Sequence, residues 1–106
     1  MSEPFYDLET VRQLASQGHI QYAGRRVQLD IQNLNYELND VLNCLCSLLV
    51  NDFCHTVNYD GERQDVYKTR YQLAGSNQHE DELYIKLLIQ NNQICIQLCS
   101  FHLQRK

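Results

Sequence analysis

Two histidines at the ends of expected elements, His55 and His102, are the side chains best suited to proton transfer. Imidazole titrates near neutral pH without help from its surroundings. Cleavage of RNA without a metal ion needs a base for the proton of the ribose 2′-hydroxyl and an acid for the leaving 5′-oxygen. It also needs donors or cations that stabilise the charged phosphorane. Histidine, tyrosine, lysine and glutamine can fill these roles, although a single histidine is more often structural.

A second set of polar side chains shares one face of an expected sheet. Its members are an amide, a phenol and three cations: Gln64, Lys68, Arg70, Tyr84 and Lys86. Such groups on one solvated surface suit the positioning of phosphates and contact with bases. Any solvated sheet face also alternates polar residues, so the pattern alone does not establish that RNA binds there.

The first half of the chain is predicted to be helical. Apolar residues at helical spacing predict a short amphipathic helix over 7–17, with Asp7 as its N-cap and Gly18 as its stop. Residues 25–35 fit either a helix or a strand, and we favour the helix. A strongly periodic helix is expected from Asn39 to Leu49.

The second half is predicted to form three antiparallel strands. Apolar and polar residues alternate over 64–71, 83–90 and 94–99, separated by a polar loop at 75–81 and a hairpin turn at Asn91-Asn92. Helices followed by strands indicate an α+β domain in which N-terminal helices pack on a small three-stranded antiparallel sheet.

The two halves meet between residues 52 and 61. Asp52 is expected to cap one short helical turn that carries residues 53–55, and Tyr59-Asp60-Gly61 is expected to form a turn. Because 106 residues make one ordinary domain, we predict a single domain over 1–106, with a helical half at about 1–58 and a sheet half at about 62–104.

Charge is distributed unevenly along the chain. The formal net charge is −4, which argues against a generic nucleic-acid binder. Residues 1–62 carry nine acids and three bases, whereas residues 63–106 carry four acids and six bases. An anionic substrate is therefore expected on one face only. No apolar run is long enough to span a bilayer, so we expect a soluble cytoplasmic protein without a membrane partner.

The five cysteines are expected to be reduced core thiols. Two sets of residues could be considered as zinc ligands: Cys95, Cys99 and His102, or Cys44, Cys46, Cys54 and His55. Neither set has the spacing of a structural zinc site. We therefore predict neither a metal ion nor another cofactor, and keep a zinc-binding regulator as the least favoured alternative.

Three short motifs carry a resemblance to a known family. They are Asn51-Asp52-Phe53-Cys54-His55, Arg63-Gln64-Asp65-Val66-Tyr67-Lys68-Thr69 and Tyr84-Ile85-Lys86. In this order, and with the first helix at matching spacing, the chain resembles the MqsR toxins of bacterial toxin–antitoxin systems. Gln-Asp-Val-Tyr is the most specific piece.

The resemblance implies a RelE-like fold and a metal-independent endoribonuclease that cuts mRNA and is neutralised by an antitoxin. Its functional positions fall on His55, Gln64, Tyr84 and His102, and Lys68, Arg70 and Lys86 are expected to bind flanking phosphates. Both histidines replace lysines of the family, which exchanges permanent charge for groups that transfer protons near pH 7. Arg63 and Thr69 replace its tryptophan and proline.

His102 is the least direct of these transfers. Counting from the Asn91-Asn92 turn places Cys99 at the family's lysine, and strict alternation places His102 on the apolar side of the strand. Only a bulge or a strand end near Cys99 would turn His102 to the polar face.

A different function stays open beside the toxin. A catalytically degenerate family member could act as a protein- or RNA-binding module, which the acidic charge favours. The residues also leave the oligomeric state open, a homodimer included.

Overall fold

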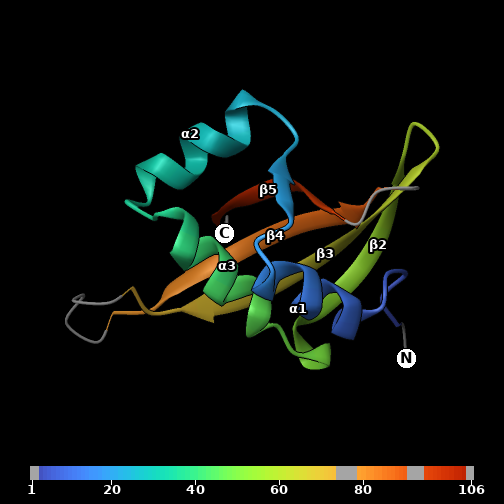
Figure 1. The fold of residues 1–106 in the computed structure, drawn as a ribbon, viewed down its shortest axis with the longest axis horizontal. Coiled ribbons are helices and arrows are strands. Elements are labelled where there is room, and N and C mark those ends of the chain that lie inside the picture. The colour runs from blue at the N-terminus through green and yellow to red at the C-terminus, as the bar shows by residue number, and fades with distance from the viewer. Residues whose placement is uncertain (1–2, 74–78, 91–94, 105–106) are drawn as a thin grey trace.

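Three α-helices and five strands make up the described part of the chain, which is residues 3–73, 79–90 and 95–104 of a computed structural model (Figure 1). The helices are α1 (Leu8–Ser16), α2 (Arg25–Asn33) and α3 (Leu38–Cys46), and a 3₁₀ turn follows at Val50–Asp52. The strands are β1 (Ile20–Tyr22), β2 (Phe53–Tyr59), β3 (Glu62–Tyr71), β4 (Asp81–Ile89) and β5 (Ile96–Leu103).

The predicted helices are all present. The Asp7 carboxylate caps α1 by accepting a hydrogen bond from the Thr10 amide at 3.1 Å. Gly18 follows the helix with a φ of 75°, a conformation that glycine adopts without strain. The ambiguous segment at 25–35 is the helix α2, and α3 ends at Cys46, three residues earlier than expected.

The sheet is larger than predicted and is mixed. Its strand order is β1-β5-β4-β3-β2, so the expectation of three antiparallel strands is wrong in strand number and in one strand direction. β1 pairs parallel to β5, with Ile20 opposite Ile96, and β2 pairs antiparallel to β3. The α+β class is confirmed, and α1 and α3 lie on one side of the sheet (Figure 1).

The segment after Asp52 is a strand and not the predicted helical turn. Asp52 ends the 3₁₀ turn, where its carboxylate accepts a hydrogen bond from the Leu49 amide at 2.9 Å. β2 then begins at Phe53 and carries His55. The expected turn at residues 59–61 is present, because Asp60 and Gly61 have φ values of 54° and 84° and join β2 to β3.

The core lies between the helices and the inner face of the sheet. The side chains buried there come from both layers: Val11, Leu14, Leu45, Leu48, Tyr67, Ile85, Leu87 and Phe101. Arg12 ties α1 to the segment that follows α3, because its guanidinium donates two hydrogen bonds to the carbonyl oxygen of Leu48. The predicted Asn91-Asn92 turn and most of the predicted loop at 75–81 fall outside the described residues.

Candidate functional site

A row of three polar side chains crosses the sheet on the face away from the helices. In the strand register, Lys68 of β3 lies opposite Tyr84 of β4, and Tyr84 lies opposite His102 of β5. The Tyr84 and His102 rings are stacked, with centroids 5.1 Å apart and an interplanar angle of 12°. A phenol and an imidazole are therefore held side by side on a rigid strand pair.

The orientation of the His102 ring favours proton exchange at one nitrogen. Nδ1 lies 2.7 Å from the carbonyl oxygen of Leu103. A carbonyl oxygen can only accept, so Nδ1 carries the hydrogen of this bond. In the neutral ring Nε2 is then the unprotonated nitrogen, which can accept a proton from a substrate.

A hollow of about 360 Å³ surrounds this row. Its lining combines cations with neutral donors: Lys68, Tyr84, Lys86, Ser100, His102 and Gln104. Lys68 is exposed, whereas Tyr84 and His102 are half-buried, so the rings form the floor and a lysine reaches the rim. Two ammonium groups beside a phenol and an imidazole suit a phosphate group in contact with all four.

A β-bulge in β5 puts His102 on this face. Lys86 lies opposite Ser100, but the next residue, Leu87, lies opposite Leu98, so Cys99 is the extra residue. The Cys99 thiol is half-buried, and this burial raises its pKa to about 11 even though Lys86 acts to lower it. The residue stacked on Tyr84 is His102, and Cys99 lies outside the hollow.

His55 lies on the same face but in the neighbouring row. It is exposed on β2 opposite Val66, and Val66 lies opposite Lys86. Adjacent strands are separated by about 4.8 Å, so His55 is roughly 10 Å across the sheet from Lys86. The hollow that contains Tyr84 is not lined by His55.

Gln64 differs most from the sequence prediction. We expected it on the open face, but its side chain is only 8% exposed. It lies four residues before Lys68 on β3, which is about 13 Å along the strand. Gln64 is therefore outside the hollow, and Val66, which lies between Gln64 and Lys68 on β3, is fully buried.

Arg70 follows Lys68 by two residues on β3, so it lies on the side of the row opposite to Gln64. It is opposite Glu82, and the two side chains form an exposed ion pair of 3.8 Å. The structure thus gathers Lys68, Lys86, Tyr84 and His102, and leaves His55, Gln64 and Arg70 around that group. Sequence reasoning missed Ser100 and Gln104, whose places depend on the bulge.

Asp65, next to Gln64, has a structural position. Its carboxylate is fully buried and accepts hydrogen bonds from the amides of Phe5 (3.1 Å) and Tyr6 (2.9 Å) and from the Thr56 hydroxyl (2.6 Å). It therefore fastens both the N-terminal segment and β2 to β3. Val66 and Tyr67, which follow it, are also fully buried.

The described residues assemble neither of the zinc sets considered from the sequence. No group of three or more His, Cys, Asp or Glu side chains in this part of the chain lies close enough to hold a metal ion. All five cysteines are unpaired by disulfides, and Cys44 is buried in the core.

Comparison with models of known families gives a match over residues 3–102. The family is described as the motility quorum-sensing regulator, toxin of MqsA. The chain belongs to the MqsR toxin family. The resemblance carried by the three motifs is confirmed, and membership makes the chain a toxin of a toxin–antitoxin system with an antitoxin as its partner. A search of curated proteins found no match. No helix among the described residues is long and apolar enough to cross a membrane.

Proposed function

We propose that this MqsR-type toxin is an endoribonuclease that cleaves cytoplasmic mRNA without a metal ion and that its antitoxin neutralises it. The observation that carries the proposal is the stacked pair of Tyr84 and His102 in one hollow with Lys68 and Lys86. This hollow offers a proton acceptor, a neutral donor and two cations within the reach of one phosphate.

In the proposed reaction the 2′-hydroxyl gives its proton to a base, and its oxygen bonds to the adjacent phosphorus. The bond from phosphorus to the 5′-oxygen then breaks, and that oxygen takes a proton from an acid. The products are a 2′,3′-cyclic phosphate and a 5′-hydroxyl. Tyr84, Lys68 and Lys86 stabilise the charged phosphorane, and His102 Nε2 exchanges one proton.

The surrounding groups complete the proposal. His55 lies three strand spacings, about 14 Å, from His102, too far to share one phosphate with it, so we propose that His55 contacts a neighbouring phosphate of the RNA. Arg70 contacts a flanking phosphate on the opposite side. Gln64 is buried and lies about 13 Å along β3 from Lys68, so we assign it no direct contact with the cleaved bond.

The test is cleavage of a single-stranded RNA by the purified protein in excess chelator, with the product ends analysed for a 2′,3′-cyclic phosphate. Tyr84→Phe, His102→Ala and His55→Ala are each expected to lower the rate at least tenfold, about 1.4 kcal/mol of barrier. Tyr59→Phe and His19→Ala are the matched controls, because both side chains are exposed away from the hollow. Full activity of Tyr84→Phe and His102→Ala would refute the site.

The binding-module alternative predicts a different outcome. Its supporting observation is the net charge of −4, which weakens affinity for RNA. It predicts no cleavage and no growth arrest on induced expression, but a stable complex with the antitoxin. Growth arrest that co-expression of the antitoxin relieves would exclude it.

A further inference from the structure

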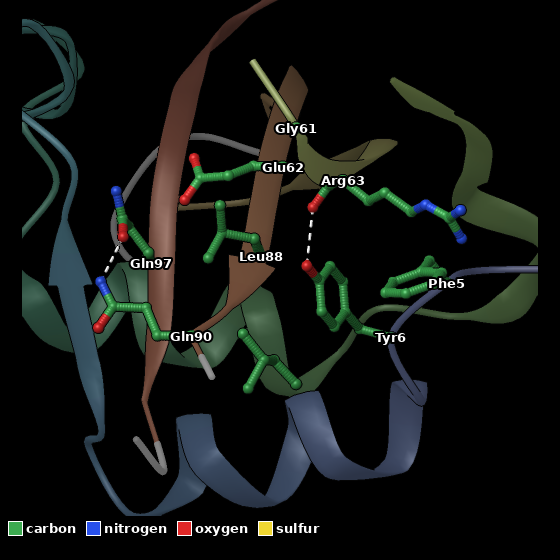
Figure 2. A pocket seen from close by; sticks show the side chains of 9 residues that line it. Phe5, Tyr6, Gly61, Glu62, Arg63, Leu88, Gln90 and Gln97 are labelled. Atoms are coloured by element: carbon green, nitrogen blue, oxygen red, sulfur yellow. Dashed lines mark hydrogen bonds between the residues drawn. The ribbon is translucent and has the colours of Figure 1, made fainter. Parts of the chain in front are cut away.

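A second hollow, of about 480 Å³, lies where β3 and β4 separate. These strands pair from Tyr71 opposite Asp81 as far as Asp65 opposite Leu87, and no further. β3 continues beside β2 to Glu62, and β4 continues beside β5 to Ile89. The two strand ends therefore diverge, and the β3–β4 cleft forms between them, lined by Phe5, Tyr6, Gly61, Glu62, Arg63, Leu88, Ile89, Gln90 and Gln97 (Figure 2).

The N-terminal segment supplies a fixed wall of this cleft. The Tyr6 hydroxyl donates a hydrogen bond of 2.8 Å to the carbonyl oxygen of Arg63, at the point where β3 has left β4 (Figure 2). The amides of Phe5 and Tyr6 are held in turn by the buried Asp65 carboxylate. The cleft is thus built before any ligand arrives, which lowers the cost of ordering it on binding.

The chemistry of the cleft suits a flat, uncharged group with polar edges. Leu88 and the Tyr6 ring give apolar surface, and the side-chain amides of Gln90 and Gln97 are hydrogen-bonded to each other beside them. The Glu62 carboxylate points into the cleft, whereas the Arg63 guanidinium turns outward over the Phe5 ring, 4.6 Å from its centroid (Figure 2). An inward carboxylate repels phosphate and accepts hydrogen bonds from an amino group.

The cleft and the Tyr84–His102 hollow lie on one surface. Leu88 and Gln97 occupy one cross-strand pair, and Leu88 follows Tyr84 and Lys86 at every second position of β4. Tyr84 and Leu88 are four residues apart, about 13 Å along the strand, with Lys86 between them. An RNA strand that follows β4 would meet cations first and the β3–β4 cleft next.

We propose that the β3–β4 cleft binds one unpaired base of the RNA substrate, near the cleaved phosphate, and selects a base with an exocyclic amino group. The proposal rests on the proposed endoribonuclease function. Proteins commonly read single-stranded RNA in this way, by stacking a splayed base on a side chain and bonding its Watson–Crick edge. Glu62 accepts from the amino group, and the Gln90–Gln97 amides bond the rest of the edge.

The first experiment sequences the cut sites in a random RNA pool. The protein is expected to favour adenine, cytosine or guanine over uracil at least tenfold at one position fixed relative to the cut. Glu62→Gln and Gln97→Leu are each expected to reduce this preference at least fivefold, whereas Tyr84→Phe lowers cleavage of all sequences alike. Glu9→Gln and Gln28→Leu are the matched controls, because both residues are exposed on the helices. An unchanged preference in both cleft variants would overturn the proposal.

The second experiment separates this proposal from the proposed function. Five-residue oligodeoxycytidine and oligodeoxyuridine lack the 2′-hydroxyl, so they bind without being cleaved. Shifts in the side-chain amide NMR signals of Gln90 and Gln97 are expected with the cytidine oligomer, and much smaller shifts with the uridine oligomer. Such shifts in a protein that cleaves no RNA would refute the nuclease and keep the base site. Cleavage without such shifts would refute the base site alone.

Discussion

Asp65→Asn tests how the Gln-Asp-Val-Tyr motif stabilises the fold. The buried carboxylate accepts three hydrogen bonds, one to Oδ2 from Tyr6 and two to Oδ1 from Phe5 and Thr56. An amide of the same shape keeps at best the two bonds to Oδ1 and points its NH₂ at the Tyr6 amide, which is also a donor. One charge-assisted bond is lost, about 1.5–3 kcal/mol, and two others become neutral bonds. We expect the free energy of unfolding to fall by about 3 kcal/mol.

The assay is equilibrium unfolding in urea, followed by circular dichroism. Thr56→Val is the partial control, since it removes one of the three charge-assisted bonds and should cost about 1.5 kcal/mol. Limited proteolysis gives a second readout, because loss of the Tyr6 bond should expose the N-terminal segment to cleavage. A loss below 1 kcal/mol for Asp65→Asn, with unchanged proteolysis, would refute the anchoring role.

Four further predictions concern buried and charged groups. The Tyr67 hydroxyl is buried and has no hydrogen-bond partner among the described residues, so Tyr67→Phe should raise the free energy of unfolding by about 1 kcal/mol. Tyr36→Phe should instead lower it by at least about 1.5 kcal/mol, because the Tyr36 hydroxyl donates to the Asp81 carboxylate at 2.7 Å; equal effects in urea unfolding would contradict both. Burial raises the pKa of Cys44 from 9.0 to about 12, so the unfolded chain ionises first above pH 9.0 and the folded protein loses about 1.4 kcal/mol of stability by pH 10. Cys44→Ala should remove this part of the fall in the free energy of unfolding between pH 8 and pH 10. If the free energy of unfolding falls as steeply with pH in the variant as in the unaltered protein, this prediction is wrong. Finally, Lys68→Gln should weaken RNA binding and reduce the salt slope of the binding constant by about 1, measured by fluorescence anisotropy; an unaltered slope would place the phosphate elsewhere.

The sequence was sufficient to predict the helices and strands that bury one apolar face in the core. α1 was predicted because Asp7 caps it and its apolar stripe is buried, and β3 and β4 because they alternate against that core. β2 was missed because it is an edge strand with side chains exposed on both faces, so it shows no alternation. The Asp60-Gly61 turn was the available signal, since such a pair joins two strands.

The sequence predicted which residue types form the site, but not which of these residues lie next to one another. The family motifs indicated Tyr84 and His102, but their contact depends on a bulge whose position no local pattern fixes. The burial of Gln64 was beyond sequence reasoning for a similar reason. Gln64 lies where β3 pairs with β2 and no longer with β4, an arrangement that no local pattern specifies.

The extra residue at Cys99 shifts the inward and outward alternation of the side chains along β5. Before it, Ile96 and Leu98 face the core, and after it Phe101 does, although Leu98 and Phe101 are three positions apart. Regular alternation at the present length, without the bulge, would push His102 into the interior and expose Phe101, whereas deleting the extra residue would leave both side chains on their present faces. The bulge therefore lets one short strand bury Leu98 and Phe101 and still present His102 to the surface, and it is the loss of the bulge, not a change in any one side chain, that would exchange the chemistry of the surface for the packing beneath it.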